Sequence, residues 1–213
     1  MGDYLGERYR QILFAAWQHL WLVAQCLVLA TVLAILIAVL VYRNKALAGI
    51  ANGLSSIGLT IPSFALVGIL IVPFGFGVVP AVIVVTFFAA LPILRNAIVG
   101  LNNIEPTVIE SARGIGMSRM KTLLTVEFPM AWPVVLTGVR ISAQMVMGVA
   151  AVVSYALGPG LGSYIFTGLS RLGGANSLES VVTAVVGVVI LALILDLILL
   201  GIGRLTTPRG IRV

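Results

Sequence analysis

Charged residues are scarce in this sequence: 9% of its 213 residues are Asp, Glu, Lys or Arg, whereas 60% are hydrophobic. Soluble globular domains contain about a quarter charged residues, so the composition excludes an ordinary soluble protein. Lipid offers no partners to backbone polar groups, and long apolar runs must therefore be helices or strands of a closed barrel. The runs are continuous rather than alternating, which indicates helices. We expect an all-α integral membrane protein with one domain over residues 1–213.

Residues that carry catalytic or metal chemistry are also few. No G-x-x-x-x-G-K-[ST] loop is present to hold nucleotide phosphates, and no pattern resembles a catalytic triad or a metal site. The single Cys26 lies in an apolar run and cannot form an intrachain disulfide. The single His19 is interpreted as an interfacial or hydrogen-bonded structural residue. We therefore expect no enzyme activity and no cofactor or metal bound by this chain.

The apolar runs predict five membrane spans, each of which needs about 20 helical residues. The uncharged run at 46–94 is too long for one span, and two prolines and two glycines at 73–80 divide it. The glycines at 158–162 end the fourth span. The expected spans are residues 20–42, 54–72, 78–94, 134–157 and 180–203.

The distribution of Lys and Arg predicts the orientation, because short cytoplasmic loops are enriched in both. Nine Lys or Arg residues lie in one set of connecting segments and only three lie in the opposite set. The richer set comprises 43–53, 95–133 and 204–213, and the poorer set 1–19, 73–79 and 158–179. We expect an N-terminus outside and a C-terminus in the cytoplasm. The net charge of +6 then favours anionic lipid rather than nucleic acid as the partner.

One charged segment, ESARGIGMSRMKTLLTVEFP at 110–129, lies between apolar runs. Pro106 suits the first position of a short helix whose cap would be Glu105 or a nearby Asn. Gly114 and Gly116 are expected to end this helix after about two turns. The first half of the segment is thus predicted to be a short helix followed by a glycine turn.

A second short helix is expected to begin at Ser118 and to end near Phe128, because Pro129 restricts the residue before it. Small side chains would let another protein approach the backbone closely, and basic side chains would pair with its acids. On physical grounds alone, the segment is either such a docking site or a solvated connection. The candidate docking residues are Glu110, Ser111, Ala112, Arg113, Gly116, Arg119 and Pro129.

The spacing in this segment resembles the signature of ATP-binding-cassette (ABC) importer permeases, E-A-A, three residues, G, nine residues, I-x-L-P. The signature maps onto Glu110, Ser111, Ala112, Gly116, Val126, Phe128 and Pro129. Ser111, Val126 and Phe128 are conservative departures from it. The resemblance implies the type I importer fold that methionine and molybdate permeases also have, with residues 95–133 as the cytoplasmic coupling loop.

Three other stretches resemble the permeases of osmoprotectant importers: TIPSFAL at 60–66, LPILRNAIVGL at 91–101 and GPGLGSYIFTGLS at 158–170. The resemblance implies half of a pore for glycine betaine, proline betaine, choline or carnitine in a bacterial-type cytoplasmic membrane. The implied partners are a second permease chain, two ABC ATPase subunits that bind ATP and magnesium, and an extracytoplasmic solute-binding protein. The outer loop at 158–177 would be a gate or a surface for that protein, or else a re-entrant packing segment.

Pro62 interrupts the second span and frees backbone carbonyls, which are tolerated in a membrane only beside protein or a water-filled cavity. Ser63 and Phe64 are therefore placed near the pathway, with a simple packing kink as the alternative. A quaternary ammonium head is bound by aromatic faces. The aromatic residues inside the spans that a pore could use are Phe64, Phe87, Phe88 and Tyr155, with core or lipid-facing positions as the alternative. Phe64 and Tyr155 join Pro62 and Ser63 as the candidate pathway residues.

Two charges, Arg140 and Asp196, lie inside the expected fourth and fifth spans. Both are roughly 10–12 Å from the inner end at 1.5 Å per residue, and the two spans run antiparallel. We predict a structural ion pair; otherwise Arg140 extends to the headgroups or Asp196 faces the pathway. The competing function is an ion-coupled secondary carrier, but such carriers usually show inverted repeats and ion-binding carboxylates. No repeat is seen here, and Asp196 is the only acid well inside a span.

Overall fold

The structure is a computed structural model that describes residues 1–157 and 160–207, except for the side chains of residues 155–157. Its regular elements are all helical, which confirms the predicted class. Four helices are long and apolar enough to span a membrane, and a fifth candidate is a pair bent by 94°. The four are α1 (Gly2–Val41), α4 (Val78–Asn102), the helix from Arg119 that includes α7 (Phe128–Leu157), and α9 (Ser177–Thr206).

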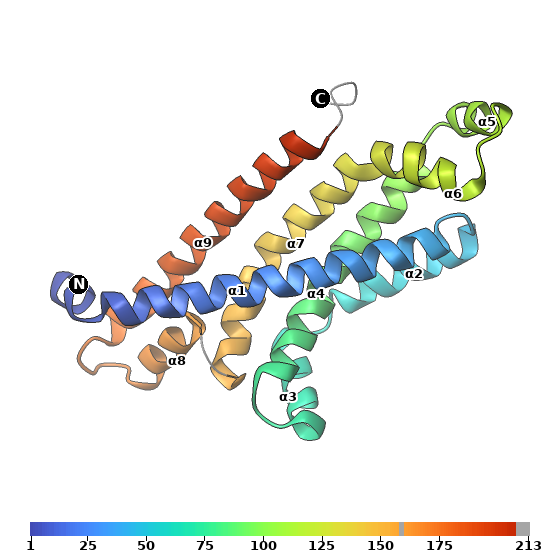
Figure 1. The fold of residues 1–213 in the computed structure, drawn as a ribbon. Coiled ribbons are helices and arrows are strands. Elements are labelled where there is room, and N and C mark those ends of the chain that lie inside the picture. Colours follow the sequence, from blue (N-terminus) through green and yellow to red (C-terminus); the bar gives the residue numbers. More distant parts are fainter. Residues whose placement is uncertain (158–159, 208–213) are drawn as a thin grey trace.

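The long helices form a bundle in which α9, α7 and α4 lie side by side and α1 crosses them (Figure 1). The ends of α4 and α9 and the start of α7 lie at one end of the bundle with α5 (Pro106–Gly114) and α6 (Arg119–Thr122). The opposite end carries α3 (Ser63–Phe74) and α8 (Gly162–Ser170). Within the part of the chain that the structure describes, the segments that are rich and poor in basic residues therefore lie at opposite ends of the molecule.

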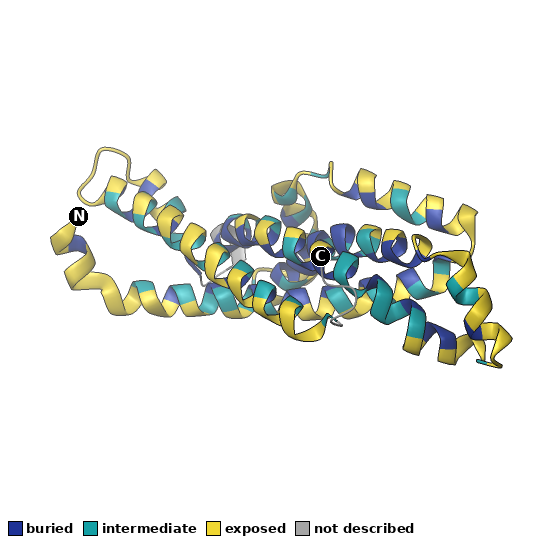
Figure 2. Cartoon of the chain, turned by 90° about the horizontal axis from the view of Figure 1, so that it is seen from above, coloured by how far each residue is buried: buried dark blue, intermediate teal, exposed yellow. Residues whose placement is uncertain are grey.

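The centre of the bundle is the contact between α4 and α7, which contains most of the buried residues (Figure 2). Lipid is as apolar as a leucine side chain, so membrane helices associate through close packing, often at small residues. A β-carbon on Gly138 of α7 would lie 2.7 Å from Cβ of Asn96 and 3.1 Å from the carbonyl oxygen of Pro92 in α4. A β-carbon on Gly100 of α4 would likewise lie 3.1 Å from the carbonyl oxygen of Ala131 in α7. The two backbones are thus in near-contact at two levels.

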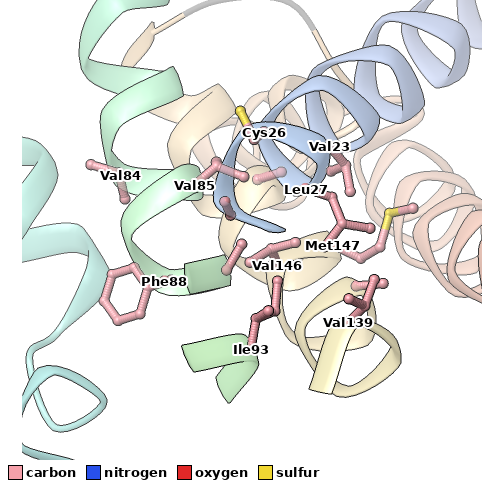
Figure 3. Packing of buried hydrophobic residues seen from close by; sticks show 14 of the residues in the cluster. Val23, Cys26, Leu27, Val84, Val85, Phe88, Ile93, Val139, Val146 and Met147 are labelled. Atoms are coloured by element: carbon pink, nitrogen blue, oxygen red, sulfur yellow. The ribbon is translucent and has the colours of Figure 1, made fainter. Parts of the chain in front are cut away.

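Helix α1 completes this core with a stripe of small and branched side chains. Ala30, Ala34 and Ala38 are fully buried, and Val23 and Leu27 pack against α4 and α7 beside Met147 (Figure 3). Cys26 lies in the same cluster and is a free, buried cysteine. The apolar face of α1 is therefore a packing surface along much of its length.

Helices α1 and α4 continue well beyond the spans predicted from the apolar runs. The first span was expected to begin near residue 20, but α1 begins at Gly2. The third was expected to end near residue 94, but α4 continues through Pro92 to Asn102. Hydropathy locates the membrane boundary, whereas a helix extends into water wherever it still has packing partners. Tyr4 near the start of α1 and Leu101 near the end of α4 are both buried.

The predicted second span, 54–72, is not one helix. Helix α2 (Lys45–Gly58) ends, and α3 begins at Ser63 at an angle of 94° to it. Pro62 occupies the N-cap position of α3, where its lack of an N–H group costs nothing because that position needs no donor. Its φ of −62° and ψ of 122° take the chain out of the helical region. The sequence identified the interruption at Pro62 but not the size of the bend.

The close packing of α4 and α7 predicts whether a Gly→Ala substitution raises or lowers the stability of the protein. Replacing a helical glycine by alanine ordinarily stabilises a helix by up to about 1 kcal/mol, but overpacking a tight contact costs about 1–3 kcal/mol. We expect Gly138→Ala to lower the thermal unfolding temperature of the detergent-purified protein. Gly148→Ala is the control, because Gly148 is on the same helix with nothing within 4 Å of its added β-carbon. An equal change in both variants would contradict the close contact.

Candidate functional site

The signature segment, defined here as 105–129, begins with helix α5 at one end of the bundle. Pro106 occupies its first position, as predicted. Glu105 occupies the N-cap position, which confirms one of the predicted cap residues, although its side chain accepts no capping hydrogen bond. One side of the helix packs against the bundle through buried Ala112 and half-buried Val108 and Ile109, and its other residues are exposed.

The turn after α5 explains why the signature contains a glycine. The N–H of Gly116 donates to the carbonyl oxygen of Arg113 at 2.9 Å, and the N–H of Met117 donates to that of Ala112 at 3.1 Å. These two bonds form a Schellman motif, whose residue after the cap adopts a left-handed conformation. Gly116 has a φ of +85°, as this position requires, whereas Gly114 is still helical. Helix α5 ends at Gly114 and the turn follows at Gly116, so the helix end predicted at these two glycines is confirmed.

The tip of the segment exposes both charged and apolar side chains. Glu110, Ser111, Arg113 and Arg119 are exposed. Ile115 and Met120 are also exposed, to 76% and 63%, on either side of the turn. Nothing lies within 4 Å of an added β-carbon at Gly114 or Gly116, so the backbone of this turn is open to close approach. A tip with basic, acidic and apolar groups around an open backbone is suited to contact with another protein.

The second half of the segment differs from the prediction. Ser118 caps α6, since its Oγ accepts from the N–H of Lys121 at 3.3 Å. The helix does not end near Phe128, however, but continues through a π-helical turn, η1 (Leu123–Glu127), directly into α7. Pro129, which is half-buried, cannot donate to the carbonyl of residue 125, and its ring would clash there in an α-helix. The wider turn lets the N–H of Phe128 bond to Leu123 and the helix continue.

A buried carboxylate at the end of this π-helical turn was missed by the sequence analysis. Glu127 is 1% exposed and is bound by two residues that follow α1. The hydroxyl of Tyr42 donates to its Oε2 at 2.6 Å, and Nη2 of Arg43 donates to its Oε1 at 2.9 Å. The signal in the sequence is a lone acid in the apolar stretch LLTVEFP. Its partners lie 84 and 85 residues away and cannot be found from local pattern.

Arg140 and Asp196 form a two-bond ion pair between α7 and α9. Nε of Arg140 donates to Oδ1 of Asp196 at 2.8 Å, and Nη2 donates to Oδ2 at 2.9 Å. The side chains are 33% and 17% exposed. Two helical turns closer to the end of the bundle that carries α5 and α6, Nε1 of Trp132 donates to Oγ1 of Thr206 at 2.7 Å. Both contacts set the antiparallel register of α7 against α9.

The candidate pathway residues are not brought into one cluster. Pro62 and Phe64 are exposed and Ser63 is half-buried at the bend between α2 and α3. Phe88 is only 4% exposed and packs in the core, which is the alternative given for these aromatic residues. Phe87 is half-buried beside it, with their ring centroids 5.3 Å apart. The Tyr155 side chain lies outside the described residues.

The single histidine and two serines of α9 have roles in packing and hydrogen bonding. His19 is fully buried, with Nε2 3.2 Å from the carbonyl oxygen of Met147, rather than interfacial. Within residues 1–157 and 160–207, no group of three His, Cys, Asp or Glu side chains is placed to hold a metal ion. Two serines near the start of α9 bind α8, because the hydroxyls of Ser177 and Ser180 donate to the carbonyls of Gly168 and Tyr164.

Known proteins resemble this chain along nearly its whole length. Residues 30–208 match the family of binding-protein-dependent transport system inner membrane components. The chain is 35% identical to the glycine betaine/carnitine/choline transport system permease protein of Bacillus subtilis over 212 residues, which is 100% of this chain and 96% of that one. It is 37% identical to an osmoprotectant import permease protein of Salmonella typhimurium over 201 residues, 92% of each chain.

A solved structure shares the fold. The inward-facing MetNI methionine ABC transporter contains a chain that superposes with a TM-score of 0.78 at 22% identity, covering 92% of this chain and 96% of that one. At that identity the likeness shows the fold, which agrees with the expectation of a type I permease. The helices of the two chains thus share one arrangement despite different sequences.

The ion pair between α7 and α9 leads to a second test. Removing one partner of a buried ion pair typically costs about 3–5 kcal/mol, and we expect roughly half of that here because the pair is partly exposed. Asp196→Ala should lower the thermal unfolding temperature, and adding Arg140→Met should restore most of the loss because no unpaired charge remains. If the double variant unfolds no later than Asp196→Ala alone, the pair does not stabilise the helix register.

Proposed function

Because this chain belongs to the family of binding-protein-dependent transport system inner membrane components, we propose that it forms half of the membrane pore of an ABC importer for a quaternary ammonium osmoprotectant. The observation that carries the substrate class is the likeness over the full chain to permeases of glycine betaine, carnitine and choline systems. A methionine transporter with the same fold is less similar in sequence. The transported solute is thus of the betaine, choline or carnitine type.

The orientation in the membrane is part of the proposal. The N-terminus and α8 face outward, and the signature segment and the C-terminal end of α9 face the cytoplasm. The excess of Lys and Arg at the end that carries α5 and α6 supports this assignment. Two tryptophans, Trp17 and Trp21, are stacked and exposed on α1, as aromatic side chains commonly are at a membrane interface.

The signature segment contacts the ATPase subunit, which binds ATP and magnesium. The exposed apolar tip of Ile115 and Met120 supplies contact area, and Arg113 and Arg119 supply charges for acidic partners. The continuous helix from Arg119 into α7 gives this contact a rigid connection to the centre of the bundle. ATP-driven movement of the ATPase is thereby transmitted to the packed pair α4 and α7. Movement of this pair changes the side of the membrane to which the pore is open.

The pathway lies beside the bend between α2 and α3, where the helical hydrogen bonding is interrupted because Pro62 has no N–H group. Backbone carbonyls at such a break need other partners. Such groups are tolerated in a membrane beside protein or water, and the exposed ring of Phe64 suits a quaternary ammonium head. A second copy of the chain or a similar permease completes the pore. An extracytoplasmic binding protein delivers the solute at the α8 end.

Transport in reconstituted vesicles tests this function. The complex would be placed in liposomes that contain ATP, with binding protein and labelled glycine betaine, choline and carnitine outside. Uptake of at least one of the three should require both ATP and binding protein and should persist when ion gradients are abolished by ionophores. Uptake that follows an ion gradient without ATP would instead identify a secondary carrier. In the described structure Asp196 is bound to Arg140, which does not favour such a carrier.

A charge reversal tests the ATPase contact. Glu110→Lys places a basic group on an exposed face, where a surface substitution changes folding stability by only about 0.5 kcal/mol or less. We expect the amount of ATPase that copurifies to correspond to about tenfold weaker binding, a loss of about 1.4 kcal/mol. The matched control is Glu7→Lys, an exposed acid near the start of α1 at the opposite end of the bundle. Equal ATPase recovery in both variants would contradict the assigned contact.

A further inference from the structure

Glu127 is buried at the junction between the signature segment and α7, where a charge is costly unless its oxygens are satisfied. Both oxygens have partners: the Tyr42 hydroxyl and the Arg43 guanidinium, at 2.6 and 2.9 Å. That guanidinium also lies over the ring of Tyr42, 5.1 Å from its centroid. The three side chains form one charge-assisted cluster, which we call the Glu127 cluster, and such hydrogen bonds are about twice as strong as neutral ones.

The backbone at this cluster departs from an α-helix. Glu127 is the last residue of the π-helical turn η1, and π-helical turns are rare and frequently mark functional sites. Pro129 follows two residues later and has no N–H to donate. The helix is therefore less constrained by its own hydrogen bonds here than elsewhere in α7, and the side chain of Glu127 ties the turn to a second element.

That second element leads away from the signature segment toward the bent helix pair. Tyr42 is the C-cap residue of α1, and Arg43 is followed by Asn44, the N-cap of α2. The Oδ1 atom of Asn44 accepts from the N–H groups of Ala46 and Leu47 at 3.0 and 3.2 Å. The Glu127 cluster therefore joins the π-helical turn to the end of α1 and the start of α2, and α2 leads to the 94° bend.

The residues packed around the Glu127 cluster join it to the π-helical turn and to the contact between α4 and α7. Tyr42 packs with Leu123 of the same π-helical turn and with Ile98 and Ala131 of the α4–α7 contact. A displacement of the turn therefore moves Glu127 and its packing neighbours together. Val108 and Ile109 of α5 are half-buried and pack against the same group of buried residues, so a movement of α5 also reaches it.

We propose that Glu127 is a positioning residue that transmits movement of the signature segment to α1 and to the bent pair α2 and α3. The proposal rests on the proposed function, because the movement is the one that the ATPase drives. Its role differs from that of Arg140 and Asp196, which join α7 to α9 away from the signature segment. Glu127 links the segment on which force acts to the segment that we place beside the pathway.

The test compares ATPase activity of the reconstituted complex with and without solute-loaded binding protein. Glu127→Gln keeps the size of the side chain and removes its charge, and Tyr42→Phe removes one hydrogen bond only. Allosteric couplings usually change affinity or response about 5–150-fold, and we expect Glu127→Gln to lose at least about fivefold of the stimulation. Tyr42→Phe should lose less. Copurification of the ATPase should be unchanged in both.

Asp196→Asn is the matched control, because it disrupts another interhelical ion pair of this chain. It should lower the thermal unfolding temperature and leave the stimulation ratio as in the wild type. A wild-type ratio in Glu127→Gln, even with lower stability, would show that the cluster is merely structural and would overturn the proposal. If Glu127→Gln does not assemble, a wild-type ratio in Tyr42→Phe overturns it. A wild-type complex without any stimulation would instead contradict the proposed function itself.

Discussion

The close approach of α4 and α7 is the contact on which the other elements depend. Gly138 lies against the carbonyl of Pro92 and Gly100 against the carbonyl of Ala131, so no larger side chain fits between the backbones at either level. Helix α1 packs across this pair with a stripe of alanines. In lipid such contacts replace the hydrophobic effect as the source of helix association. They hold the two ends of the bundle at fixed positions, and functional segments are attached at those ends.

The helices are irregular at the two places where we propose that the chain moves. Pro62 separates α2 from α3, and Pro129 accompanies the π-helical turn before α7. In a membrane each irregular backbone segment must find polar partners in protein or water. At the π-helical turn the carboxylate of Glu127 is bound by Tyr42 and Arg43 from the α1–α2 connection. The two irregular segments are thus joined through α2, which gives the proposed movement one physical route from the signature segment to the proposed pathway.

The sequence predicted the features that depend on neighbouring residues or on depth in the membrane. Continuous apolar runs predicted a helical membrane protein, and the motif spacing predicted a turn at Gly116. The depths of Arg140 and Asp196 brought two residues 56 positions apart to one level. The contact of Glu127 with Tyr42 could not be found in this way, because the segment was expected to be solvated there and not to continue as helix into α7. The length of α1 was likewise underestimated, since hydropathy reports lipid contact rather than helix length.

The central claim is that the opposite ends of this chain contact different partners on opposite sides of the membrane. Ile115 at the signature segment and Leu172 after α8 are equally exposed, at 76% and 77%, and mark the two ends. A photo-reactive amino acid at each position in the assembled importer measures which subunit it touches. The account predicts that position 115 cross-links only to the ATPase and position 172 only to the binding protein. Cross-linking of both positions to the same partner, or in the reverse order, would contradict it.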